Sequence, residues 1–135
     1  MLILALDTTT RVSSCATARD GVVLCEHAGD ASTPQAERLP GDLMTLLERS
    51  GIALPEIDAF AVATGPGSFT GLRIGIATMQ GLAFAMEKPL IGVSGFDALA
   101  FSLRRKPEAT AERDAIATPH AMAGPHSTAP GRIAT

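Results

Sequence analysis

ATGPGSFTGLRIG, residues 63–75, is the stretch of sequence that decides the fold, because it joins a short apolar run to a long uncharged one. The apolar run over 57–64 is typical of a buried strand, and Ser68 is placed to cap a helix that begins at Phe69. That helix is expected to continue to about Glu87, since Pro89 stops it. The stretch therefore predicts a strand, a glycine-rich loop and a helix in direct succession.

The residues before this unit predict three antiparallel strands. LILALD (2–7) has the continuous apolar character of a strand buried on both faces. The runs 12–18 and 22–27 flank Asp20-Gly21, a pair that readily adopts the positive φ angles of a tight hairpin turn. Cys15 and Cys25 are expected on these two neighbouring strands as reduced, partly buried thiols.

A helix is expected over 33–50, where leucines at 39, 43, 46 and 47 share one face. Pro40 lacks a backbone donor, so the regular helix either starts close to it or bends there. Downstream, 90–94 predicts a third buried strand, and Ser94 with Asp97 resembles a capping box for a last helix to about Arg105. The expected order is β-β-β-α-β-α-β-α, an α/β fold with a mixed five-stranded sheet.

Composition limits the domain count and the class of protein. A chain of 135 residues with a net charge of -3 suits one domain and carries no basic footprint for direct binding of nucleic acid. Residues 1–105 are expected to form that domain. From Lys106 to Thr135, four prolines and few large apolar residues predict a disordered tail. The apolar stretches are too short for a signal peptide or a spanning helix, so we expect a cytoplasmic protein.

The glycine-rich loop matches neither of the common phosphate-binding motifs. Leu72 and Arg73 stand where a Walker loop needs Lys and Ser or Thr, and the glycines at 65, 67 and 71 are spaced one residue too widely for a dinucleotide fingerprint. A glycine-rich turn at a helix N-terminus still makes weak anion binding available. Ser68 has no histidine near it in sequence, and His120 and His126 do not match zinc-binding spacings, so no catalytic residue and no metal site are predicted.

Two other features point to function. No charged residue lies between Arg73 and Glu87, so the helix must be covered on most sides, and Gly71, Gly75 and Thr78 form a small-residue strip that would let another helix approach closely. The cover is a partner chain, a second domain or the leucine-rich helix. LALDTTT places Asp7, Thr8 and Thr9 at the end of a strand, where they could meet a magnesium nucleotide, or where Asp7 could simply cap a turn.

Four segments, in this order, resemble the TsaB (YeaZ) family: ILALDTTT, AERLPGDLMTLL, GPGSFTGLRIGIATMQGLAFA and PLIGVSGFDALA. The resemblance implies an actin-like, sugar-kinase-like (ribonuclease H-like) fold. It covers the N-terminal subdomain over 1–105, while 106–135 is a non-homologous tail and the family's second subdomain is expected to be missing. A solitary lobe would leave apolar surface exposed, which predicts a marginally stable or oligomeric protein.

The resemblance also implies a role in biosynthesis of threonylcarbamoyladenosine in tRNA. Members are non-catalytic assembly subunits that bind the catalytic subunit TsaD, with the ATPase TsaE joining the assembly. On this basis the chain itself needs no cofactor, because ATP and a metal ion are expected in the partner subunits. Contact with tRNA is expected to be only indirect.

The family's helical interface implies partner contacts on two helices. The residues that match it are Leu39, Leu43 and Met44 on the first helix, and Phe69, Gly71, Arg73, Gly75, Ile76 and Gln80 on the second. Gln35 departs from the family, which commonly has a histidine there. Two alternatives stay open: an ATP-binding phosphotransferase or ATPase that uses Asp7, Thr8 and Thr9, and a homodimer formed through the same two helices.

Overall fold

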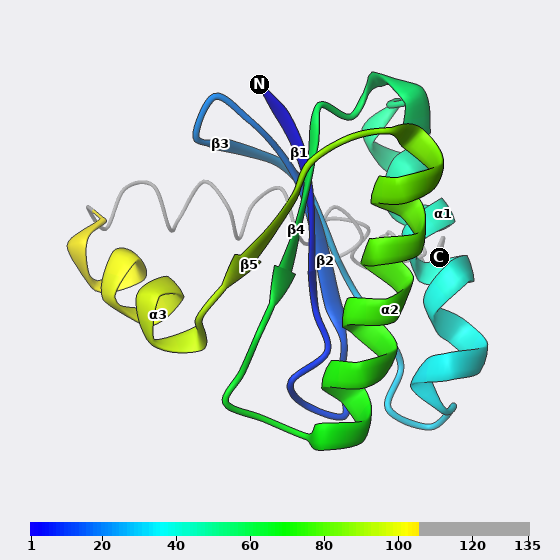
Figure 1. Ribbon diagram of the computed structural model, residues 1–135, viewed down its shortest axis with the longest axis vertical. Helices are drawn as coiled ribbons and strands as arrows, with labels where there is room; N and C mark the ends of the chain where they lie inside the picture. The colour runs from blue at the N-terminus through cyan, green and yellow to red at the C-terminus, as the bar shows by residue number, and fades with distance from the viewer. Residues whose placement is uncertain (106–135) are drawn as a thin grey trace, which may run out of the picture.

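The sheet is mixed, with strand order β3-β2-β1-β4-β5, and a computed structural model describes it within residues 1–105 (Figure 1). β1 pairs antiparallel with β2 and parallel with β4, which confirms the predicted fold class. The predicted tail over 106–135, with His120 and His126, lies outside the described residues. The strands are β1 (Leu2–Asp7), β2 (Ser14–Arg19), β3 (Val22–Ala28), β4 (Ala59–Ala63) and β5 (Leu90–Val93).

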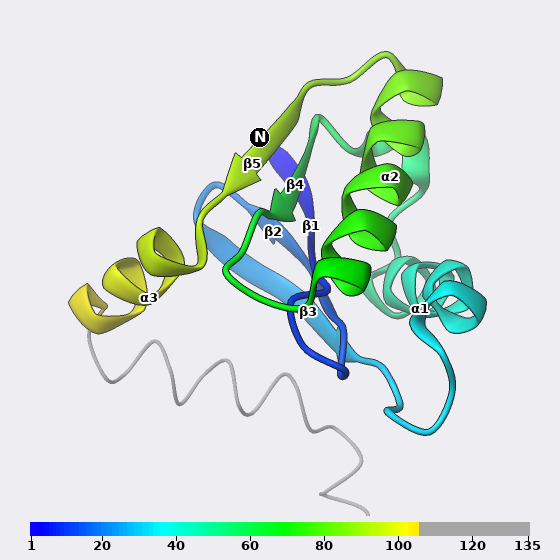
Figure 2. The same ribbon diagram turned by 60° about the horizontal axis from the view of Figure 1, so that its bottom comes forward.

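Helices lie on both sides of this sheet. Figures 1 and 2 show α1 and α2 together on one side and α3 on the other. No helix among residues 1–105 is long and apolar enough to cross a membrane. The helices are α1 (Gln35–Ser50), α2 (Phe69–Met86) and α3 (Gly95–Arg104), with a short 3-10 turn, η1 (Leu54–Glu56), before β4.

Strand alternation places the core on the side of α1 and α2. Leu2, Leu4 and Leu6 of β1 are buried there, next to Phe60 and Val62 of β4. The buried stripe of α1 consists of Leu39, Leu43, Leu46 and Leu47, and α2 adds Met79 and Ala83. Burial of a side chain such as Phe60, which is 0% exposed, contributes about 1.5–3 kcal/mol to stability. Ile3 and Ala5, which point to the other side of the sheet, are only half-buried. β1 was predicted to be buried on both faces, and the structure buries it fully on one face only.

The predicted turn and the Ser68 cap are confirmed, and Ser94 caps α3 as predicted, although its hydroxyl pairs with the Phe96 amide rather than with the Asp97 amide that a capping box would use. Asp20 and Gly21 both have positive φ, at 50° and 82°, in the β2–β3 hairpin. The Ser68 hydroxyl accepts a hydrogen bond from the Gly71 amide at 3.2 Å, and the Ser94 hydroxyl accepts one from the Phe96 amide at 3.2 Å. Local side-chain chemistry therefore sets the starts of α2 and α3.

One predicted boundary and one predicted burial are corrected. α1 begins at Gln35, so Pro40 lies inside the helix, on its exposed side. β5 was expected to be buried, yet Ile91 is 44% exposed and Gly92 is exposed. The reason is topological, because β5 is an edge strand that pairs only with β4.

Cys15 and Cys25 lie on neighbouring strands, as predicted, and both are free, buried thiols. Burial and, to a smaller extent, the nearby Asp42 carboxylate together raise the pKa of the Cys15 thiol to about 12. The thiol is therefore held in its neutral form at physiological pH.

The raised pKa of Cys15 predicts a loss of stability in alkali. The thiol of the unfolded chain ionises near pH 9.0 and that of the folded chain near pH 12, so the stabilising difference is intact below pH 9 and is lost as pH rises toward 12. Urea unfolding at pH 8 and pH 10 should show a fall on the order of 1 kcal/mol from this residue. A Cys15→Ala variant should show a correspondingly smaller fall, and an equal fall in both proteins would contradict the assignment.

Candidate functional site

The glycine-rich loop packs directly on the turn that follows β1. The Ser68 amide donates a hydrogen bond to the Thr9 carbonyl at 2.8 Å. A Cβ atom added at Gly67 would lie 2.5 Å from the Thr9 Cβ and 2.6 Å from its carbonyl oxygen. Gly67 is therefore required for close backbone approach, and the two stretches singled out in the sequence meet here.

Thr8 fills a notch formed by two glycines one helical turn apart. Its side chain is 0% exposed, and its hydroxyl donates to the Gly71 carbonyl at 2.7 Å. A Cβ at Gly71 would lie 2.2 Å from the Thr8 carbonyl oxygen, and one at Gly75 would lie 2.1 Å from the Thr8 hydroxyl. We call Gly71 and Gly75 around Thr8 the glycine notch.

The glycine notch corrects the predicted small-residue strip. Gly71 and Gly75 are buried by the chain's own Thr8, so they do not offer a track for a helix from another molecule. Thr78, the third member of that strip, turns its hydroxyl to the Ile74 carbonyl of its own helix at 2.7 Å. Gly71 and Gly75 therefore serve the internal contact between α2 and the end of β1.

The three residues expected at a nucleotide have different environments. Thr8 is buried with its hydroxyl engaged, and Thr9 is half-buried against Gly67. Asp7 is exposed, and its carboxylate accepts a hydrogen bond from the Thr9 amide at 2.8 Å. The turn-capping alternative for Asp7 thus matches the geometry, and Thr8 is a packing residue.

The exposed side of α2 forms a nearly uncharged surface, which we call the outer face of α2. Its only formal charge is Arg73, whose guanidinium lies 5.5 Å from the centroid of the Phe69 ring. Phe69 is 74% exposed and Phe84 is 87% exposed. The outer face comprises Phe69, Thr70, Arg73, Ala77, Gln80, Gly81, Phe84 and Ala85.

The predicted partner contacts divide between this surface and the core. Met44, Phe69, Arg73 and Gln80 are exposed, and Ile76 is half-buried. Leu39 and Leu43 are corrected to core residues, 1% and 6% exposed, because the leucine stripe of α1 faces the sheet. Gly71 and Gly75 are likewise internal.

The sequence prediction missed five members of the outer face, namely Thr70, Ala77, Gly81, Phe84 and Ala85. Extending the helical period from Arg73 by four and by eleven residues would have found Ala77 and Phe84. Gly81 differs from the notch glycines, since an added Cβ there would meet no atom within 4 Å.

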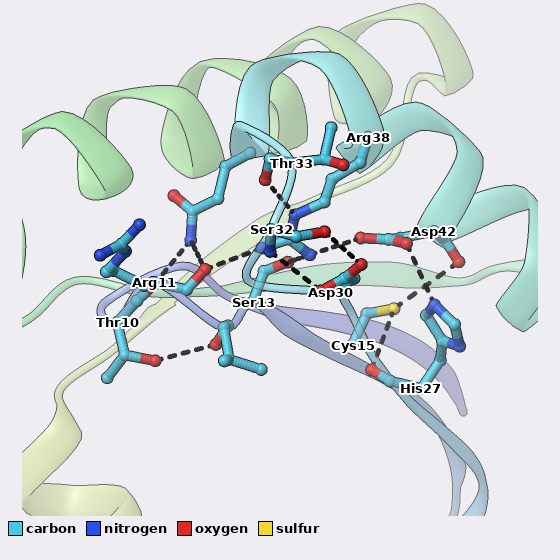
Figure 3. Close-up of polar contacts among 12 residues, drawn as sticks. Thr10, Arg11, Ser13, Cys15, His27, Asp30, Ser32, Thr33, Arg38 and Asp42 are labelled. Carbon is cyan, nitrogen blue, oxygen red and sulfur yellow. Dashed lines mark hydrogen bonds and ion pairs between the residues drawn. The ribbon is translucent and has the colours of Figure 1, made fainter.

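Polar contacts of Arg38 and Asp42 tie α1 to the sheet (Figure 3). The sequence analysis did not predict these contacts. The Arg38 guanidinium lies 3.0 Å from the Asp42 carboxylate and donates to the Ser13 hydroxyl at 3.0 Å. The other oxygen of Asp42 lies 3.1 Å from Nε2 of His27 on β3. The i, i+4 spacing of Arg38 and Asp42 was the signal available in the sequence.

The same arginine also fixes the loops at the start of α1. Its guanidinium donates to the carbonyl oxygens of Arg11, at 2.8 Å, and Thr33, at 3.1 Å. Gln35, which stands where the family commonly has histidine, donates to the Thr10 carbonyl at 2.6 Å. Nearby, hydrogen bonds from the Ser32 hydroxyl and amide hold the pKa of Asp30 below its usual value. These contacts organise the loops and bring no three potential metal ligands together anywhere in residues 1–105.

The glycine notch predicts opposite effects for two glycines of the same helix. Gly75→Ala should destabilise the protein by about 1–3 kcal/mol, because the methyl group collides with Thr8. Gly81→Ala, the matched control, should stabilise by up to about 1 kcal/mol, because alanine is the better helix former and the site is open. Urea unfolding of both variants tests this. Adding Thr8→Ala to Gly75→Ala should restore part of the loss, and similar effects of the two glycine substitutions would refute the notch.

Known proteins resemble this chain in sequence. The chain is 43% identical over 110 residues to the tRNA threonylcarbamoyladenosine biosynthesis protein TsaB of Escherichia coli K12, covering 82% of this chain and 47% of that protein. The Haemophilus influenzae TsaB is 36% identical over 119 residues, covering 85% of this chain and 50% of that protein. The chain thus spans about half the length of these curated relatives.

Solved structures agree with the sequence matches. A Pseudomonas aeruginosa protein described as similar to peptidase YEAZ superposes with a TM-score of 0.69 at 40% identity, covering 79% of this chain and 49% of that one. Thermus thermophilus RuvC, with a TM-score of 0.52 at 15% identity over 85% of this chain and 78% of its own, shares the fold. The family model described as TsaD, tRNA N6-adenosine threonylcarbamoyltransferase, matches residues 18–119. The chain therefore belongs to the TsaD family and, within it, to the TsaB (YeaZ) proteins.

Proposed function

We propose that this chain acts in the biosynthesis of threonylcarbamoyladenosine in tRNA as a non-catalytic assembly subunit that binds a TsaD-like catalytic subunit, with a TsaE-like ATPase in the same assembly. The names of its relatives supply the pathway. The outer face of α2 is the observation that carries the assembly role.

This surface has the properties of a docking site for another protein. It exposes two large aromatic side chains, Phe69 and Phe84, and carries a single formal charge. Aromatic residues are enriched at interface centres, and a surface with few charges costs little to desolvate. A helix from a partner laid along α2 would cover Ala77 and Gly81, whose small side chains allow close approach, and would bury both phenylalanines.

Three side chains that could carry chemistry have structural uses, which supports a non-catalytic role. The Ser68 hydroxyl caps α2, the Thr8 hydroxyl fills the glycine notch, and the Asp7 carboxylate caps a turn. We assign the ATP, the metal ion and the transfer chemistry to the partner subunits. The net charge of -3 accords with contact to tRNA through those partners rather than directly.

The test is a substitution at the most exposed aromatic residue of the outer face. Phe84→Glu should weaken binding to TsaD by at least about tenfold, since a carboxylate would have to be desolvated at the interface. The matched control is Phe96→Glu on α3, an exposed phenylalanine on the other side of the sheet, which should leave binding unchanged. Size-exclusion chromatography with light scattering of each variant mixed with TsaD measures the complex, and circular dichroism verifies the fold.

A cellular readout distinguishes binding from function. In cells depleted of their own TsaB, the unmodified chain should raise the threonylcarbamoyladenosine content of tRNA, measured by mass spectrometry, and Phe84→Glu should not. A complex with TsaD that survives Phe84→Glu, or that is lost equally in Phe96→Glu, would overturn the assignment of the outer face of α2.

A further inference from the structure

The turn between β1 and β2, over residues 8–13, contacts both α1 and the loop that leads into α2. On the α2 side, its Thr9 carbonyl accepts a hydrogen bond from the Ser68 amide at 2.8 Å. The preceding residue, Thr8, lies in the glycine notch and donates to the Gly71 carbonyl. We call residues 8–13 the β1–β2 turn. Its backbone conformation thus bears directly on the place where α2 begins.

Two side chains of α1 bind the next two carbonyls of the same turn. The Gln35 amide donates to the Thr10 carbonyl at 2.6 Å, and the Arg38 guanidinium donates to the Arg11 carbonyl at 2.8 Å. The same guanidinium donates to the hydroxyl of Ser13, at the end of the turn, at 3.0 Å. Three consecutive carbonyls therefore tie the turn to the start of α2 on one side and to α1 on the other.

Arg38 is itself held by other parts of the chain. Its side chain is 8% exposed, and its guanidinium lies 3.0 Å from the Asp42 carboxylate and donates to the Thr33 carbonyl at 3.1 Å. A Cβ atom added at Gly29 would collide with its Nη1 atom, so the guanidinium occupies the space that a side chain there would need. Figure 3 shows the polar contacts that meet at this guanidinium. The planar fork of arginine binds several acceptors at once, which the single ammonium of lysine does not.

Gln35 reaches the first turn of α2 as well as the β1–β2 turn. Its amide oxygen lies 3.0 Å from the position that a Cβ atom at Gly71 would take, so the two residues are in close contact. Gln35 is half-buried and is the first residue of α1. Loss of its amide donor would therefore release the turn beside the glycine notch without opening the buried leucine stripe of α1.

The centre of the β1–β2 turn is exposed, which makes its shape depend on these hydrogen bonds. Thr10, Arg11 and Val12 are all exposed. An exposed backbone segment gains conformational freedom once the bonds that hold it are removed. Thr9, whose carbonyl anchors the Ser68 amide, is the neighbour of this exposed segment. Release of the turn is therefore expected to loosen the loop that leads into α2.

We infer that Arg38 and Gln35 are positioning residues for α2, because from α1 they hold the β1–β2 turn in the shape that fixes the start of that helix. Phe69, its first residue, and Arg73, one turn later, belong to the outer face of α2. Their placement then depends on two side chains of another helix. For partner binding the inference rests on the proposed function and extends it, since it gives a role to residues that lie off the docking surface.

The first test measures amide hydrogen exchange in the full chain by NMR. The Ser68 amide, bonded to the Thr9 carbonyl, reports on the loop before α2, and the Phe60 amide, buried in the sheet, reports on global unfolding. In Gln35→Met, the protection of the Ser68 amide should fall at least about tenfold, while that of the Phe60 amide falls less than about threefold. Arg38→Met should lower the protection of the Ser68 amide in the same way.

Arg49→Met is the matched control, because Arg49 lies near the other end of α1, where its guanidinium donates to the Glu26 carbonyl at 3.4 Å. It should change the protection of the Ser68 amide by less than about twofold. If Arg38→Met lowers the circular dichroism signal, Arg38→Lys replaces it, since lysine keeps the charge and loses the fork. Equal falls at Ser68 and Phe60 would indicate a general loss of stability and overturn the positioning role, as would an unchanged Ser68 amide.

Binding of TsaD connects the turn to the outer face of α2. Gln35→Met should weaken this binding by about threefold to tenfold, because a loosened surface must be ordered on association, and Arg49→Met should leave it unchanged. Binding that survives Gln35→Met but is lost in Phe84→Glu would overturn the role in partner binding and leave the proposed function intact. Binding that survives Phe84→Glu would overturn the proposed function, while exchange of the Ser68 amide still decides whether α1 positions α2.

Discussion

The contact of Thr8 with Gly71 and Gly75 is the constraint on which the rest of the structure depends. It brings the end of β1 against the first turns of α2 at a distance that no side chain on either glycine would permit. The buried hydroxyl of Thr8 also donates a hydrogen bond to the Gly71 carbonyl. A buried polar group is thereby paired, and the register between strand and helix is set by one threonine rather than by a general apolar contact.

Fixing α2 in this way determines which surfaces remain for other molecules. With Gly71, Gly75, Met79 and Ala83 turned inward, the helix must present Phe69 and Phe84 outward. On the other side of the sheet, the alternation that buries leucines against α1 and α2 leaves alanines behind. The described part of the molecule therefore has two unlike surfaces, a helix face with exposed aromatic residues and a sheet face on which alanines lie.

Much of the fold could be predicted from the sequence, because local patterns carry it. The Asp20-Gly21 turn, the Ser68 cap and the leucine stripe of α1 each follow from neighbouring residues alone. Periodicity shows which residues share a face, but it does not show what lies against that face. Periodicity therefore predicts a partner contact for Leu39 and Leu43, although both pack on the sheet. It likewise predicts that another helix packs on Gly71 and Gly75, although Thr8 occupies the space beside them. The edge position of β5 and the contacts of Arg38 depend on topology, which short-range patterns do not encode.

The scarcity of charge on the outer face of α2 has a kinetic consequence. Long-range electrostatic steering accelerates association only where the two surfaces carry opposite potentials. Arg73 is the single formal charge on this surface, and it lies over the Phe69 ring. Encounter with a partner should then proceed at the ordinary rate of about 10⁵–10⁷ M⁻¹s⁻¹ and respond little to ionic strength. Occupancy of this surface would follow the cellular concentrations of the two proteins and the lifetime of the complex, rather than the salt content of the surroundings.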